Sequence, residues 1–266
     1  MLLENLVFVF VAGFVTALAT GLGAIPFFVV DDISDRWNVI LWGLASGIMV
    51  SASLFGLIGE GLQYGNELLM IPGLLAGVAL VVVGHRVISH ADIDPREYER
   101  ADFAKLVLIL GVLTVHSFPE GVAVGVSFAE LGFESGDALS ILGFTVPILG
   151  VFMTIAISIH NVPEGVAISI PLEAMGVSNP RKVWWAVFSS LPQPIGAVIA
   201  FYFVTLARAF LPLGFGFAAG AMIYLVVTEF IPEGLEAGEN LPSDGRPELA
   251  AGILVGVLFM VPLAFV

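Results

Sequence analysis

Long apolar runs, broken by short polar stretches, fill the chain from one end to the other. A helix needs about 20 consecutive apolar residues to cross the hydrocarbon core of a bilayer, and about eight segments of this sequence qualify. The predicted helices cover about residues 5–30, 37–59, 68–88, 103–128, 139–172, 183–207, 214–231 and 249–266. A charged stretch at 89–102 is too polar for a span and too short for a domain, so we predict a linker there. The pattern predicts an all-α integral membrane protein in which residues 1–266 form one polytopic domain.

Basic residues divide unevenly between the two sides of these predicted spans. Alternating the sides leaves only Arg208 on one of them and puts the rest of the nine Lys and Arg residues on the other. Because basic loops are retained in the cytoplasm, the side with most of them is predicted to be cytoplasmic. This orientation puts the linker in the cytoplasm and both termini outside the cell.

The sixth predicted helix is interrupted by Pro192 and Pro194. Proline lacks a backbone N–H and breaks the helical hydrogen-bond ladder, which is tolerated in lipid only where neighbours satisfy the freed groups. We therefore predict a break at this point. Gln193, between the prolines, either hydrogen-bonds the freed backbone or lines a pathway.

Composition narrows the chemistry and the partners. Hydrophobic residues make up 58% of the chain, against about 45–50% in soluble domains. There is no cysteine, so disulfides, iron–sulfur clusters and thiolate metal sites are excluded, and His, carboxylate, amide and Met side chains remain as ligands. A net charge of -14 argues against nucleic acid and anionic-lipid partners. An acidic, lysine-poor chain is typical of salt-loving microbes, and we expect a prokaryotic cell-membrane protein.

One motif occurs twice, each time inside an apolar run. It reads HSFPEGVA from His116 and HNVPEGVA from His160, with Glu120 and Glu164 one helical turn after the histidines. Ionisable groups at this depth are costly and usually mark an ion or proton path. If the two helix faces meet, two imidazoles and two carboxylates form a cluster that suits Zn²⁺ and other first-row divalent ions.

Each candidate metal-site residue also has a purely structural explanation. A single copy of the motif is compatible with a buried hydrogen-bonded pair, but two matched copies favour a bound cation or proton. Met49 is more often a packing residue than a thioether ligand. Glu229 and Glu233 are predicted at a cytoplasmic helix end, where carboxylates are normally solvated. His85 and His90, with the acidic residues after them, are candidates for catching a metal ion that leaves the membrane, but loop charge is the more common explanation.

At this point the sequence resembles a known family. The paired phrases HSFPEGVAVGV and HNVPEGVAISI, on the fourth and fifth of eight predicted helices, resemble the ZIP (Zrt/Irt-like) divalent-metal transporters, most closely their prokaryotic GufA-type branch. Other stretches are similar to the family's second, sixth and seventh helices: GIMVSAS from Gly47, PQPIG from Pro192, AAGAM from Ala218 and EFIPE from Glu229. The likeness covers essentially the whole chain.

The resemblance implies a 3+2+3 arrangement of helices and an elevator-like alternating access that moves Zn²⁺, or a similar ion, into the cytoplasm as the transported substrate. No cofactor is implied. The implied main metal site consists of Met49, His116, Glu120, His160 and Glu164. The implied second site uses Ser117, Asn161 and Gln193, with Glu120 and Glu164 bridging.

Several positions depart from the family pattern. Many relatives have Asn at the position of Ser117 and Glu at that of Gln193, so the second site has lost a carboxylate and we expect it to be weak or absent. His160 stands where GufA-type relatives often have Gln, which favours Zn²⁺-like ions. Thr228 stands where His is frequent, which weakens an exit-site role for Glu229.

Two other classes of function remain open from the residues alone. An intramembrane zinc-dependent hydrolase would use the same His/Glu cluster to activate water, although no HExxH motif is present. A proton-conducting or sensory protein would use these groups without metal. The sequence does not rank Zn²⁺ against Cd²⁺, Fe²⁺, Mn²⁺ or Co²⁺, and it leaves open the driving force and the oligomeric state, a homodimer included.

Overall fold

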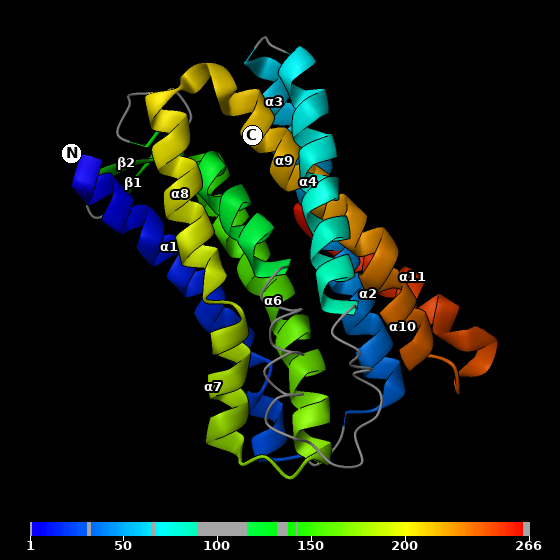
Figure 1. Ribbon diagram of the computed structural model, residues 1–266. Helices are drawn as coiled ribbons and strands as arrows, with labels where there is room; N and C mark the ends of the chain where they lie inside the picture. The colour runs from blue at the N-terminus through cyan, green and yellow to red at the C-terminus, as the bar shows by residue number, and fades with distance from the viewer. Residues whose placement is uncertain are drawn as a thin grey trace.

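Helices make up almost all of the part of the chain that the structure describes (Figure 1). The computed structural model describes residues 2–30, 33–64, 67–89, 116–131, 138–141 and 143–262. The main helices are α1 (Leu2–Leu22), α2 (Asp35–Ser51), α3 (Gly59–Gln63), α4 (Glu67–Ser89), α6 (Ile148–Ala174), α7 (Asn179–Ser189), α8 (Pro192–Leu206), α9 (Leu211–Leu225), α10 (Ile231–Ala237) and α11 (Arg246–Met260). Residues 116–127 are also helical. Among the described residues, six helices are long and apolar enough to cross a membrane, as expected for a multi-pass membrane protein.

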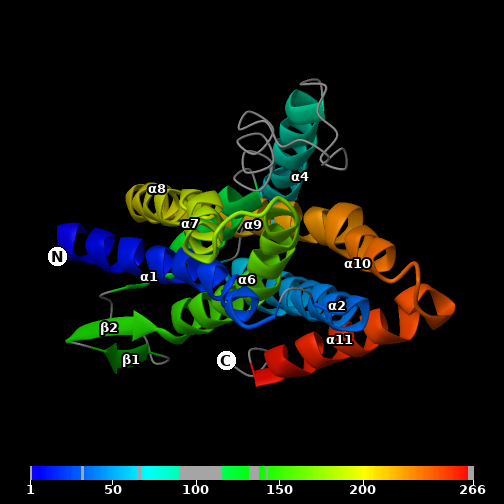
Figure 2. The same cartoon turned by 90° about the horizontal axis from the view of Figure 1, so that it is seen from below.

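The helices form two bundles that lie side by side (Figures 1 and 2). In the first bundle, α1 packs on α6, α7 and α8, and the helix at 116–127 lies against the start of α8. In the second bundle, α4 packs on α9, and α11 runs along α2, which also contacts α10. Helix α2 packs on α6 as well, so it joins the two bundles.

Glycines on the contacting sides of the helices determine how closely the helices pack against one another. A Cβ on Gly47 of α2 would collide with the carbonyl oxygen of Ile253 in α11, and one on Gly77 of α4 would collide with that of Phe217 in α9. Without a hydrophobic driving force between helices in lipid, such close backbone packing supplies much of the attraction. The glycines therefore hold each bundle together.

Two predicted helices continue beyond the ends expected from the sequence. Helix α2 passes through the π-helical segment η2 (Ala52–Ile58) into α3, and α9 passes through a second π-helical segment, η4 (Val226–Phe230), into α10. The helix expected to end at residue 231 continues through Pro232 of α10, directly after the π-helical segment η4. Glu229 consequently lies inside a continuous helical segment.

Three further boundaries differ from the predictions. The helix expected at 139–172 begins at Ile148, because β1 (Ala138–Ile141) and β2 (Phe144–Pro147) form an antiparallel hairpin before it. Gly143, with φ of +83°, supplies the turn that an L side chain disfavours. The described residues are therefore nearly, not entirely, α-helical.

Helix α1 ends at Leu22, well before residue 30, and a short 3₁₀ segment η1 (Ile25–Phe28) follows. The last helix, α11, starts slightly before the expected residue 249. The 3₁₀ segments η3 (Arg208–Phe210) and η5 (Pro242–Gly245) connect helices in the C-terminal half. The break expected at the prolines is confirmed, because α7 ends at Ser189 and α8 begins at Pro192. Most of the predicted linker, and the predicted helix up to residue 115, lie outside the described residues.

Candidate metal-binding site

The two copies of the repeated motif meet in the interior. Glu120, from the helix at 116–127, lies beside His160 and Glu164 of α6, and one potential ligand atom from each falls within 4.8 Å of the others. The Nε2 atom of His160 is 3.1 Å from Oε1 of Glu120. All three side chains are buried, Glu164 with 2% of its surface exposed. We call these three residues the central cluster.

Glu164 has an unusual environment for a buried carboxylate. Within the described part of the chain, neither of its oxygens has a hydrogen-bond partner. Taking an ionised carboxylate out of water costs several kcal/mol unless a counter-charge or hydrogen bonds compensate. A cation between Glu164, Glu120 and His160 would supply that counter-charge, and the three ligand types suit a divalent ion such as Zn²⁺.

A chain of buried amides borders the central cluster. Asn161 Nδ2 donates hydrogen bonds to the carbonyl oxygen of Thr16 (2.8 Å) and to Oε1 of Gln193 (3.1 Å). Gln193 Nε2 in turn donates to Oε2 of Glu120 at 2.5 Å. Asn161, Gln193 and Ser117 are all fully buried. The residues implied for a second metal site thus lie in the interior, two of them hydrogen-bonded to one another.

Glycines of the repeated motif explain how these groups come so close. A Cβ on Gly121 would collide with the carbonyl oxygen of Gln193, so only glycine lets the start of α8 approach Glu120. A Cβ on Gly165 would collide with the carbonyl oxygen of Thr20 in α1 in the same way. The motif therefore carries the ionisable groups together with the space that their neighbours need.

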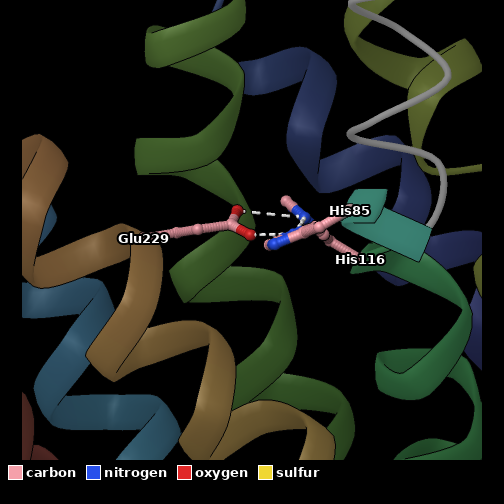
Figure 3. A group of neighbouring side chains, drawn as sticks. All are labelled: His85, His116 and Glu229. Carbon is pink, nitrogen blue, oxygen red and sulfur yellow. Dashed lines mark hydrogen bonds and ion pairs between the residues drawn. The ribbon is translucent and has the colours of Figure 1, made fainter. Parts of the chain in front are cut away.

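A second cluster combines His85 of α4, His116 and Glu229 of η4, with potential ligand atoms within 4.8 Å of one another. Figure 3 shows both imidazoles facing the carboxylate of Glu229. His116 Nε2 lies 3.0 Å from Oε2 of Glu229 and 3.2 Å from Nε2 of His85, and His85 also pairs with Glu229. We call these residues the bridging cluster, because His85 and Glu229 belong to the second bundle and His116 to the first.

Two residues that the family resemblance implied for the main metal site lie outside the central cluster. His116 belongs to the bridging cluster and not to the central cluster. Met49, on α2, is fully buried in the hydrophobic core between the helices. Sequence reasoning favoured loop charge over metal capture for His85 and a solvated carboxylate for Glu229, yet both residues are in the bridging cluster. The available signal was that each is an ionisable residue inside or at the edge of an apolar run. His90 lies outside the described residues.

An apolar bundle of membrane-length helices with buried imidazoles and carboxylates is the architecture of a multi-pass membrane protein that handles cations. The family model described as "ZIP Zinc transporter" matches residues 90–264. The chain belongs to the ZIP family. This family consists of transporters, not enzymes, and metal ions are their substrates rather than cofactors.

Individual relatives match over most of the chain. A putative zinc transporter of Arabidopsis thaliana, At3g08650, is 37% identical over 93% of this chain but only 37% of that protein. Zinc transporter GufA of Myxococcus xanthus is 33% identical over 86% of this chain and 89% of its own length. Zinc transporter ZIPB of Bordetella bronchiseptica is 32% identical over 81% of this chain and 69% of its own length. The chain therefore spans little more than a third of the Arabidopsis protein but most of the two bacterial ones.

Proposed function

We propose that this protein carries divalent metal ions, zinc foremost, across the cell membrane into the cytoplasm by alternating access. The central cluster binds the ion in transit, and the ion is cargo rather than a resident cofactor. The observation that carries the proposal is Glu164, a buried carboxylate whose two oxygens have no hydrogen-bond partner among the described residues. The zinc transporters among the relatives support zinc as the cargo.

The proposed topology has eight spans in a 3+2+3 arrangement with both termini outside the cell. Six candidate spans among the described residues support it, together with the helix at 116–127 and the 15-residue α11. The prevalence of basic residues on one side of the predicted spans favours a cytoplasmic location for that side.

The bridging cluster extends the proposed path. His116 and Glu120 lie one turn apart on the same helix, with about 5–6 Å between their Cβ atoms, so the two clusters are neighbours along this helix. Two imidazoles and a carboxylate again suit Zn²⁺. Because this cluster takes residues from both bundles, relative movement of the bundles would open or close it. Alternating access requires a site whose accessibility changes when the two bundles move relative to each other.

Zinc uptake into proteoliposomes that contain a zinc-sensitive dye tests the proposal. We expect Glu164→Gln, which keeps the side-chain shape and removes the charge, to reduce uptake at least tenfold. Glu239→Gln, an equivalent change at an exposed residue after α10, should leave uptake unchanged. Equal uptake by the native protein and the Glu164→Gln variant would overturn the central cluster as the transport site.

A further inference from the structure

We propose that the hydrogen bond between Tyr64 and Glu130 is a gate that closes the space between the two bundles on the proposed outer side of the membrane. Ion uptake requires this contact, the outer gate, to open and then to close behind the ion. The inference rests on the alternating access proposed above, and it assigns the closing contact on one side to two particular residues.

The outer gate joins two segments that are each fixed to their own bundle. Tyr64 directly follows α3, and its ring stacks on that of Phe215 in α9, with 6.0 Å between the ring centroids. On the other side, the carbonyl oxygen of Leu131, next to Glu130, accepts a hydrogen bond of 3.1 Å from Asn5 of α1. The Tyr64 hydroxyl donates to Oε1 of Glu130 at 2.9 Å. Separation of the bundles at this point therefore breaks the hydrogen bond.

The central cluster borders the interface that the outer gate closes. His160 belongs to the first bundle, and its ring centroid lies 6.2 Å from that of Phe230 in η4 of the second bundle. Along the chain, Glu120 stands between His116 of the bridging cluster and Glu130 of the outer gate. The gate and the bridging cluster thus lie on opposite sides of the central cluster. An ion that enters between the bundles from the gate side meets the closed contact first.

The other end of the same interface is hollow. A cavity of about 240 Å³ is lined by α2 and α10 of the second bundle and by Ala167 and Ile170 of α6 in the first. Asn38, near the start of α2, also lines it, whereas Tyr64 directly follows the continuous helical run Asp35–Gln63, which is long enough to cross a membrane. The gate and the cavity are therefore near opposite membrane faces. A molecule closed at one face and hollow at the other is one of the two states that alternating access requires.

The strength of the contact suits a gate that opens and closes. Hydrogen bonds to charged groups shift an equilibrium by about tenfold or more. Tyr64 and Glu130 are both partly exposed, so water competes for the same groups and we expect the low end of this range. The hydrogen bond therefore favours the closed state without making it permanent.

Labelling of a cysteine behind the gate measures how often the gate opens. The native chain has no cysteine. Ser127 lies two turns after Glu120 on the same helix face and is 3% exposed, so Ser127→Cys should react slowly with a membrane-impermeant maleimide added to intact cells. Tyr64→Phe keeps the ring and removes the hydroxyl, and we expect it to raise the labelling rate about tenfold. Tyr202→Phe, the same change at an exposed tyrosine of α8, should leave the rate unchanged. An unchanged rate in Tyr64→Phe would overturn the outer gate.

A double-mutant cycle shows whether the two residues act through each other. Glu130→Leu removes the acceptor and should raise the labelling rate by a factor similar to that of Tyr64→Phe, whereas Glu130→Gln, which keeps an acceptor, should raise it by less than about threefold. Combining Tyr64→Phe with Glu130→Leu should leave the rate near that of either single variant, because both changes remove the same contact. Effects that multiply would show that the two residues act separately, which contradicts the inference.

Cross-linking tests the closed state directly. In the Tyr64→Cys, Glu130→Cys variant, a flexible bifunctional methanethiosulfonate reagent, as long as the two side chains that it replaces, should join the cysteines in the purified protein. We expect the cross-linked protein to lose zinc uptake after reconstitution and to regain it on reduction, because the bundles can no longer separate at the gate. Each single-cysteine variant, treated in the same way, should keep its uptake. Cysteines that do not cross-link, or normal uptake after cross-linking, would overturn the inference.

The transport site and the outer gate can fail separately. If Glu164→Gln abolishes uptake but the cross-link has no effect, transport through the central cluster stands and the gate is wrong. If the cross-link blocks uptake but Glu164→Gln transports zinc normally, the gate stands and the central cluster is not the path.

Discussion

The two buried carboxylates of the repeated motif have very different partners. Glu120 is held on one oxygen by Gln193 and approached on the other by His160, whereas Glu164 has no hydrogen-bond partner among the described residues. Glu120 is thus oriented before an ion arrives, and Glu164 gains most from the ion's arrival. This division of roles predicts that the stability of the protein depends on metal through Glu164.

Thermal unfolding in detergent measures this dependence. A ligand that binds only the folded state stabilises it by about 2.7 kcal/mol at a concentration of one hundred times its dissociation constant. We expect zinc to raise the melting temperature of the native protein and to raise that of Glu164→Gln by clearly less, because only the bridging cluster is left intact in this variant. The exposed variant Glu239→Gln should respond to zinc as the native protein does. An undiminished zinc response in Glu164→Gln would show that this carboxylate does not bind the ion.

The repeated motif predicted that Glu120, His160 and Glu164 lie together in the interior, and the structure brings these three side chains together. The motif was not sufficient to place His116. The partners of a residue on a helix depend on which neighbouring helix packs against it. The spacing of residues within one helix does not reveal which neighbour that is. His85 and Glu229 approach His116 from elements far away in the sequence.

At the level of elements, the hydrophobic pattern located the helices but not all of their ends. The seventh predicted helix ends at residue 231, yet η4 and α10 continue it past that point. Pi-helical turns of this kind often occur at functional sites, and η4 contains Glu229. The hairpin before α6 was also missed, because short apolar strands and the start of an apolar helix have similar sequences.

Close helix contacts through glycine give a prediction at this scale. In Gly77→Ala the added methyl group would meet the carbonyl oxygen of Phe217, so α4 and α9 would have to separate. Overpacking of this kind costs about 1–3 kcal/mol. Gly59→Ala is a matched control, since its methyl group would lie 3.6 Å from its nearest neighbour, the carbonyl oxygen of Leu54.

Thermal unfolding of the two variants in the same detergent checks this expectation. Gly77→Ala should unfold at a lower temperature than the native protein, and Gly59→Ala should not. If both variants unfold at the native temperature, the glycine faces are not what sets the packing of α4 on α9.

In the molecule as a whole, two separate sets of polar contacts join the two bundles. The bridging cluster links His116 of the first bundle to the second, and Tyr64, directly after α3, donates a hydrogen bond of 2.9 Å to Glu130 beyond the helix at 116–127. Burial, and then the hydrogen bond to Glu130, raise the pKa of Tyr64, so its hydroxyl remains a donor. These contacts hold the bundles in the relative position seen here, and the proposed alternating access requires them to break and re-form.

The central claim is that the buried carboxylates of the repeated motif bind the ion in transit. Its most direct test is zinc uptake into dye-loaded proteoliposomes by the native protein and by the double variant Glu120→Ala, Glu164→Ala, with zinc binding measured in parallel. We predict that only the native protein binds zinc at the central cluster and fills the vesicles. Uptake by the double variant at the native rate, or native protein that binds zinc without moving it, would contradict the claim.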